Sequence, residues 1–283
     1  MTQRRAFDKN YLKQEFDKLN TTITNDPLTL YLIGGGAMAF YGIKVATKDV
    51  DIILTNPEDL NSLQTALTTT GCKEPNPITI TRAYHQMQTS AILENQDGFR
   101  WDLFLTKICG KLTLSTNMQN RANTLYQGNK LKVCIVSKED LFLFKSITNR
   151  DADLDDTRIL AQSGLNWEII VQECKNQSQT SKVCWEDALY QTLQDLKTKY
   201  DIEAPIEKDL RKTAQQKIIE TAILMQLDRK NNTIRDIAKA LDESPNFVRT
   251  ELYKLADKGT VVANKSSKPH KFRLPHKSNQ QNE

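Results

Sequence analysis

Residues 28–54 read LTLYLIGGGAMAFYGIKVATKDVDIIL, and this stretch decides the fold. The apolar run 28–33 predicts a buried strand, the glycines at 34–36 predict a turn, and residues 37–41 predict a short helix. A second strand is expected over residues 49–54. The stretch therefore predicts a strand, a glycine turn, a helix and another strand within one compact unit.

Asp49 and Asp51 form a carboxylate pair at the start of the second predicted strand. Because one residue separates them, both side chains project from the same face, while Val50 and Ile52 point to the other. The two charges repel each other, and Mg²⁺ or Mn²⁺ would offset that repulsion by taking oxygen ligands from both. A lone Asp-x-Asp also fits a solvated strand face, but the preceding strand and glycines favour a metal site.

Asp102 is the candidate for a third acidic ligand. Strands over residues 83–93 and 99–105 are expected to flank the turn at residues 95–98, which ends in Asp-Gly. If the strand that carries Asp102 lies beside the Asp49 strand, three acids can hold two metal ions roughly 4 Å apart. One ion would activate an attacking hydroxyl and the other would stabilise a leaving pyrophosphate.

The glycine turn supplies candidate nucleotide contacts. Backbone N–H groups of a tight turn that opens a helix can bind triphosphate oxygens, and glycine lets a phosphate approach closely. No Gly-Lys-Ser/Thr follows, which excludes a P-loop, and the Gly-x-Gly-x-x-Gly spacing of a dinucleotide site is absent. The candidate residues are Gly34, Gly35 and Gly36.

The other periodic segments predict an α/β (α+β) domain with a mixed sheet over residues 1–164. They comprise helices over residues 7–19, 57–69, from 138 onward and 152–162, and a strand over residues 131–136; Asn56 and Ser137 are placed as helix caps.

The last part of the chain predicts two further regions. Residues 165–208 read as a helical connector, broken by the polar run 176–181. Residues 209–283 give the outline of a winged helix-turn-helix with a basic tail, with helices over 210–227, 234–241 and 246–258 and strand-like pieces at 260–263 and 271–274.

In such a module the third helix enters the major groove and the wing contacts the nucleic-acid backbone. The backbone contacts would be sensitive to salt and indifferent to sequence. Binding of protein or RNA, or dimerisation, remains an alternative, and the tail also fits a solvated disordered segment. The candidate nucleic-acid-binding residues are Asn246, Arg249, Thr250, Tyr253, Lys254, Lys265, Lys268, Lys271 and Arg273.

The segments 32–37 and 47–52 resemble the first motif of DNA polymerase-β-like nucleotidyltransferases. They are most similar to the branch that contains AbiEii-type toxins of toxin–antitoxin pairs and related archaeal and bacterial proteins. Many members carry arginine at the position of Val45, whereas the nearest base here is Lys44. The residues that match are Gly34, Gly35, Gly42, Thr47, Asp49 and Asp51, and the resemblance implies that Thr47 helps to bind the nucleotide.

The same branch has a later helical lysine, followed by an arginine and a helix that bears Asp-x-x-Asp. Lys145, Arg150, Asp153 and Asp156 are similar in order and spacing. Lys145 and Arg150 would neutralise triphosphate charge, and the two aspartates, which share a helix face, would orient the lysine. Without the resemblance, these residues also fit an exposed ion-pair cluster. The resemblance covers about residues 28–164.

Composition limits the chemistry. The 283 residues include five scattered cysteines, which suggest neither disulfides nor a zinc site, and three histidines in unrelated places. Any catalysis should therefore rely on carboxylates. No membrane span or signal peptide is recognised, so a cytoplasmic protein is expected.

The first hypothesis is a metal-dependent nucleotidyltransferase that moves an NMP from an NTP to a hydroxyl of RNA, such as tRNA, or of protein. A toxin-like role, with nucleic acid and an antitoxin or a second copy as partners, is compatible with it. The alternative is a DNA-binding transcriptional regulator whose transferase-like domain senses a nucleotide or mediates interactions. The acid triad argues against the alternative, and Val45 mildly favours it.

Overall fold

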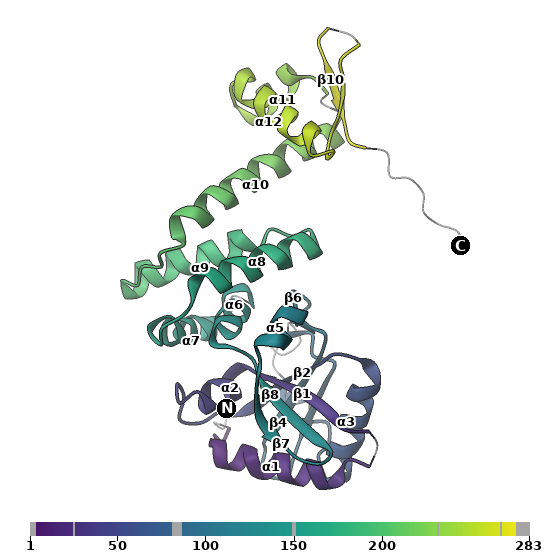
Figure 1. Cartoon of the computed structure of the whole chain (residues 1–283), viewed down its shortest axis with the longest axis vertical. Coiled ribbons are helices and arrows are strands. Elements are labelled where there is room, and N and C mark those ends of the chain that lie inside the picture. Colours follow the sequence, from purple (N-terminus) through teal and green to yellow (C-terminus); the bar gives the residue numbers. More distant parts are fainter. Residues whose placement is uncertain are drawn as a thin grey trace, which may run out of the picture. The chain divides into compact units, whose positions relative to one another are not determined.

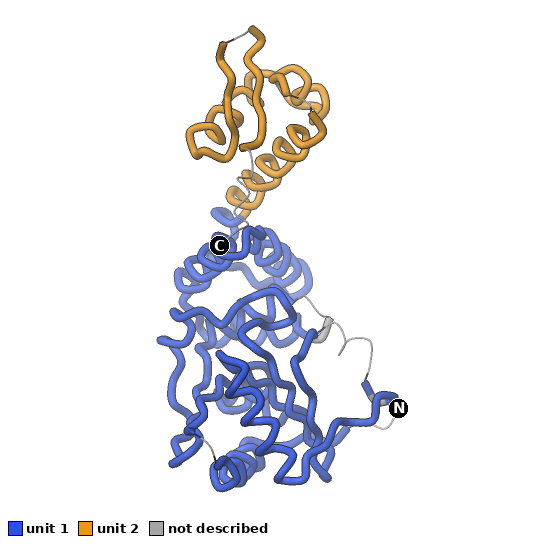
Figure 2. The backbone as a smooth tube through the Cα atoms, turned by 90° about the vertical axis from the view of Figure 1, so that its right-hand side faces the viewer, with its two compact units in different colours: residues 1–210 blue, residues 211–283 orange. Residues whose placement is uncertain are grey.

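The computed structural model describes residues 4–24, 26–80, 87–148, 151–230, 232–266 and 268–275 (Figure 1). The chain divides into two compact units, residues 1–210 and residues 211–283 (Figure 2). Each unit has its own hydrophobic core. The described part of the chain contains no helix that is long and apolar enough to cross a membrane.

A mixed six-stranded sheet forms the centre of the first unit, with the order β3-β4-β2-β1-β8-β7. The pairs β1/β8 and β2/β4 are parallel, and the other neighbours are antiparallel. The strands are β1 (Leu28–Ile33), β2 (Asp49–Leu54), β3 (Ala91–Glu94), β4 (Arg100–Leu105), β7 (Asn123–Gln127) and β8 (Leu131–Ile135); a small hairpin is formed by β5 (Lys107–Ile108) and β6 (Leu112–Thr113).

Helices cover this sheet, and several begin at side-chain caps that the sequence supplies. The Asn56 side chain accepts a hydrogen bond from the Asp59 N–H at 2.8 Å, and the Ser137 hydroxyl accepts one from the Asp140 N–H at 3.2 Å. Helices α6 to α9 pack together on one side of the unit, and α1 lies on the other (Figure 1). The helices are α1 (Lys9–Thr22), α2 (Gly34–Phe40), α3 (Pro57–Thr69), the 3₁₀ helix η1 (Pro77–Thr79), α5 (Thr116–Arg121), α6 (Lys138–Thr148), α7 (Asp151–Gln162), α8 (Trp167–Ser181) and α9 (Trp185–Tyr200).

An aromatic cluster packs one face of the sheet against α1. Trp101 is fully buried, and its ring centroid lies 6.1 Å from that of Phe16 on α1. Val50 is the register partner of Trp101 and is also fully buried. One face of β2 and β4 therefore packs in the core with α1, and the alternating residues are left for the opposite face.

The described residues of the second unit form three helices and a hairpin. The helices are α10 (Glu207–Asp228), which begins in the first unit, α11 (Ile234–Leu241) and α12 (Pro245–Asp257); the strands β9 (Val262–Asn264) and β10 (Lys271–Arg273) pair antiparallel. The core is apolar and includes Ile223, Ile237, Val248, Leu252 and Phe272.

The predicted strands 28–33 and 49–54 and the predicted helix 57–69 are confirmed. The strand predicted over 83–93 was wrong for residues 87–90, because β3 begins only at Ala91; residues 83–86 lie outside the described part. The predicted helix 37–41 begins earlier, at Gly34. The glycines therefore form the first turn of α2 instead of a turn before it.

The predicted break at residues 176–181 was also wrong, because α8 continues through this polar run. Buried partners explain the difference. The Gln177 amide donates to the Thr113 carbonyl at 2.7 Å and accepts from the Thr113 N–H at 3.1 Å, and the Ser178 hydroxyl donates to Glu186. These polar side chains are satisfied inside the first unit, so the helix can bury them.

Candidate active site

The register of two parallel strands brings the predicted acids to one face of the sheet. Asp51 on β2 is the direct partner of Asp102 on β4, although 50 positions of sequence separate them. Asp49 lies two residues before Asp51 and shares its face, whereas Val50 and Trp101 occupy the opposite, buried face. The sheet therefore presents Asp49, Asp51 and Asp102 on the same side.

The start of α2 lies directly against Asp51. Gly34 has φ +63°, and a Cβ at this position would overlap the Asp51 carboxylate, with 2.7 Å to Cγ. A Cβ on Gly35 would lie 2.7 Å from Thr47 Oγ1, whereas one on Gly36 would meet apolar side chains. Gly34 and Gly35 are thus required by the close approach of α2 to β2, and Gly36 serves packing.

Thr47 supports the strand that carries the acids. Its hydroxyl donates to the Asp49 carbonyl at 2.9 Å, and its backbone exchanges two hydrogen bonds with Phe7, at 2.7 and 2.9 Å. Thr47 is buried. Its contacts orient the beginning of β2 and tie the N-terminal segment to it.

Arg4 reaches the acidic face, a contact that the sequence pattern does not indicate. One guanidinium nitrogen lies 3.5 Å from an Asp49 carboxylate oxygen. The other donates to the Lys48 carbonyl at 2.8 Å and to the Gly98 carbonyl at 3.3 Å. Arg4 therefore joins the beginnings of β2 and β4 and balances part of the charge of Asp49. The contact spans 45 positions, so no local periodicity could have revealed it.

Asp102 is 1 % exposed, and within the described residues neither carboxylate oxygen has a hydrogen-bond partner. Burial raises the pKa of Asp102 well above its usual range, and the charges of Asp51 and Asp49 raise it further; Arg4 and Arg100 act in the opposite direction. A buried carboxylate without a partner is costly unless a cation or a proton neutralises it. The donor set therefore fits a hard divalent cation.

The acids do not yet converge on one point. In the described part of the chain, no three His, Cys, Asp or Glu side chains lie close enough together to hold a metal ion. Asp49 contacts Arg4, and Asp102 lies below the surface. Coordination by all three acids would require side-chain rotation, of Asp49 in particular.

A buried ion cluster lies on the helical side of the site. Lys145 on α6 lies 3.0 Å from an Asp153 oxygen and 2.7 Å from an Asp156 oxygen, and the Thr148 hydroxyl donates to Asp153 at 2.8 Å. Burial opposes the charged form of Lys145, but the two aspartates outweigh it and raise the pKa of this amine. Lys145 is therefore held as a cation. Arg150, the other predicted base, lies outside the described residues.

Lys44 belongs to the same cluster. Its amine lies 2.5 Å from the Asp156 oxygen that Lys145 does not contact. The neighbouring Val45, where the related branch often carries arginine, is 92 % exposed. Lys44 was identified from the sequence as the basic residue nearest to Val45, but the sequence pattern does not indicate that Lys44 pairs with Asp156.

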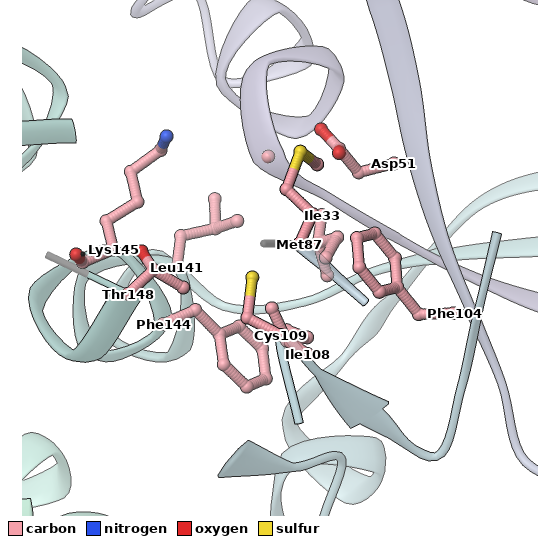
Figure 3. Close-up of a pocket in the computed structure, with 11 residues that line it drawn as sticks. Ile33, Asp51, Met87, Phe104, Ile108, Cys109, Leu141, Phe144, Lys145 and Thr148 are labelled. Atoms are coloured by element: carbon pink, nitrogen blue, oxygen red, sulfur yellow. Dashed lines mark hydrogen bonds between the residues drawn. The ribbon is translucent and has the colours of Figure 1, made fainter. Parts of the chain in front are cut away.

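Asp51 and Lys145 line a common pocket that opens to solvent. Figure 3 shows the Lys145 amine and the Asp51 carboxylate at opposite sides of this pocket, with Phe144, Ile108 and the Cys109 sulfur in the part below them. Gly34 and Thr148 also line it. The pocket therefore combines an anionic wall, a cationic wall and an apolar floor.

In the second unit, several predicted nucleic-acid contacts already have partners. Lys254 lies 2.7 Å from Glu251, and this contact, together with one from Gln216, lowers the pKa of Glu251 despite its burial. The Lys265 amine lies 5.3 Å from the centroid of the Tyr253 ring, whose hydroxyl is 2.6 Å from His270 Nδ1.

The remaining predicted contacts lie on the exposed surface of this unit. Arg249 contacts the Asn246 side chain at 3.4 Å. Lys268, Lys271 and Arg273 are exposed on the hairpin and its loop.

The comparison with curated proteins gave no match. Residues 10–204, more than half of the chain, match the family described as "Nucleotidyltransferase of unknown function (DUF6036)". The matched span contains the glycines of α2, the three acids and the Lys145 cluster. With these features inside the matched region, the chain belongs to this family of nucleotidyltransferases.

Proposed function

We propose that the protein is a metal-dependent nucleotidyltransferase that moves an NMP from an NTP to an acceptor hydroxyl of RNA, such as tRNA, or of a protein. The observation that carries this proposal is the pairing of Asp51 with Asp102 across parallel strands, with Gly34 pressed against Asp51. The family supports nucleotidyl transfer in general. The acidic face supplies the candidate metal-binding side chains for this reaction.

Asp49, Asp51 and Asp102 are the residues that would hold Mg²⁺ or Mn²⁺. The fit rests on two buried Asp102 oxygens that lack partners in the described part of the chain, beside a second carboxylate on the same face. A divalent cation bound there would activate the acceptor hydroxyl and offset charge on the pyrophosphate. To bind the cation, Asp49 would release Arg4. Asp102 would contribute its negative charge to the site once it is deprotonated.

The nucleotide phosphates would lie between Asp51 and Lys145. Lys145 is charged, fixed by Asp153 and Asp156, and open to the pocket that Asp51 also lines. Charge-assisted hydrogen bonds from a fixed ammonium suit phosphate oxygens. Gly34 and Gly35 would bring backbone N–H groups to the phosphates, and Gly36 would pack the same turn against the core. Thr47 holds the adjoining strand, and Arg150 is proposed as a further base.

We further propose that residues 209–283 are a winged helix-turn-helix that recruits nucleic acid, with residues 165–208 as a connector to a transferase domain of residues 1–164. Three helices followed by an antiparallel hairpin support this assignment. Exposed cations on α12 and the hairpin support an anionic partner. The contact residues would be Asn246, Arg249, Lys254, Lys265, Lys268, Lys271 and Arg273.

Resemblance to the AbiEii branch supports a toxin-like role, with an antitoxin or a second copy as partner. A second candidate function is a DNA-binding regulator whose first unit senses a nucleotide. The contact of Arg4 with Asp49 favours it, because a guanidinium now occupies part of the proposed metal face. Alanine variants of Asp49 and Asp51 separate these functions, because a regulator without the two aspartates would keep its DNA binding and its cellular effect.

The test is transfer of label from each of the four NTPs, with Mg²⁺ or Mn²⁺, to total cellular RNA and protein. The wild-type chain should label one fraction, and Asp51→Asn should not. Asp26→Asn is the matched control, because Asp26 is an exposed acid outside the site. Absence of product with every NTP and both metals, or equal labelling by Asp51→Asn, would contradict the proposal.

A further inference from the structure

Two lysines from distant parts of the first unit share one carboxylate. Lys44 follows α2 and lies 2.5 Å from one Asp156 oxygen, while Lys145 of α6 lies 2.7 Å from the other. We propose that Lys44 is a second triphosphate-binding residue, which exchanges Asp156 for phosphate oxygens when the nucleotide arrives. This inference rests on the proposed nucleotidyltransferase function and names a further residue of the same site.

The two amines differ in how firmly they are held. Lys145 is buried and has two carboxylate partners, Asp153 and Asp156. The Lys44 side chain is 33 % exposed, and Asp156 is its one ion-pair partner among the described residues. When the Lys44 contact opens, water can reach the partly exposed amine, and the buried Asp156 keeps Lys145 as its partner. Lys145 is the fixed cation of the cluster, and Lys44 is the exchangeable one.

Lys44 is not part of the pocket lining itself, but its amine shares the Asp156 carboxylate with Lys145, which lines the pocket. The N–H groups of Ile43 and Lys44 both donate to the Met38 carbonyl, at 2.9 and 3.2 Å, and so hold the loop against the end of α2. The other end of α2 is Gly34, which lines the pocket with Asp51. Since Lys44 and Lys145 reach the same carboxylate, the Lys44 amine lies beside the cationic wall of that pocket.

The charge balance of the cluster also suits an exchange. Within this cluster the charges of Lys44 and Lys145 are balanced by those of Asp153 and Asp156. Two ammonium groups on one carboxylate repel each other, and phosphate oxygens would give each its own anionic partner. Lysine can move to a phosphate as a compact point charge, with no need for the fixed geometry of a guanidinium.

The experiment compares Lys44→Met with wild type and with Lys13→Met, which removes an exposed lysine of α1 outside the site. Steady-state transfer gives kcat and KM, and titration with the NTP and with the matching NMP gives two dissociation constants. Lys44→Met should raise KM and the NTP dissociation constant roughly tenfold, as the loss of one phosphate contact implies, and leave kcat and NMP binding unchanged. Lys44→Arg should restore most NTP binding.

A purely structural ion pair predicts a different result. Lys44→Met would then lower the melting temperature and weaken NTP and NMP binding equally, or leave both at the wild-type value; either outcome overturns the assignment. The titrations do not require turnover. If the wild-type chain forms no product with any NTP, the proposed function fails while selective loss of NTP binding in Lys44→Met still supports this assignment. If the wild-type chain does not bind NTP at all, the assignment of Lys44 fails as well.

Discussion

Replacement of Gly34 by alanine probes the contact between α2 and Asp51. Gly34 has φ +63°, a conformation that costs other residues about 1–2 kcal/mol. Its new Cβ would also overlap the Asp51 carboxylate, so that side chain must rotate or shift. Forcing Asp51 off its rotamer adds about 0.5–1.5 kcal/mol. Gly34→Ala should therefore lower the free energy of unfolding by about 1.5–3.5 kcal/mol.

Gly71→Ala is the matched control. Gly71 also has positive φ, +94°, but a Cβ there would meet nothing within 4 Å. It should show the conformational cost alone, about 1–2 kcal/mol, with wild-type transfer. Displacement of a reacting group by about 1 Å can cost 100-fold in rate, so Gly34→Ala should lose about that much transfer activity.

Urea unfolding and the initial rate of NTP-dependent labelling measure the two effects of these variants. Rates should be compared at a temperature at which both variants are fully folded. If Gly34→Ala transfers label at the wild-type rate, or is no less stable than Gly71→Ala, then the approach of α2 does not position Asp51.

Three further outcomes follow from the same contacts. Burial raises the pKa of Asp102 in the folded state, so the wild-type chain loses stability as pH rises from the unfolded value near 4 through the folded pKa. Without divalent metal, Asp102→Asn lacks this loss and should gain about 1–3 kcal/mol relative to wild type as pH is raised through that range. A difference between the two chains that stays constant with pH in urea unfolding would contradict this prediction. Lys145→Met removes a positive charge that compensates the buried carboxylates of Asp153 and Asp156, so it should lower the free energy of unfolding in urea by about 3–5 kcal/mol. A decrease below about 1 kcal/mol would mean that the cluster is not a buried ion network. Lys271→Ala should weaken nucleic-acid binding equally across sequences and reduce the salt slope by about one unit; an unchanged slope in fluorescence anisotropy would remove Lys271 from the interface.

Local signals in the sequence predicted the strands around the site well. The bounds of β1, β2 and α3 were predicted because their apolar periods and the Asn56 cap are contained in the segments themselves. β7 was missed because its residues are exposed or half-buried at the sheet edge and show no apolar alternation. The β5–β6 hairpin is too short to produce a period.

In the candidate site too, features encoded in a short segment could be predicted, whereas contacts between segments far apart in the sequence could not. Asp49 and Asp51 were predicted from their spacing together with the preceding strand and glycines, and Asp102 required an assumption about strand neighbours, which the β2/β4 register satisfies. The contacts of Arg4 with Asp49 and of Lys44 with Asp156 join segments 45 or more positions apart, and charges on the sequence do not say which partners they choose. Such pairings depend on the packing of the whole unit.

The most direct test of nucleotidyl transfer uses one NTP labelled either at the α-phosphate or at the γ-phosphate. We predict that the α-label enters the acceptor, that the γ-label is released as pyrophosphate, and that Asp49→Asn and Asp51→Asn abolish both events. Asp26→Asn should behave as wild type. Transfer of the γ-label to the acceptor, or incorporation of α-label that persists in Asp51→Asn, would show that these aspartates do not support transfer of an NMP.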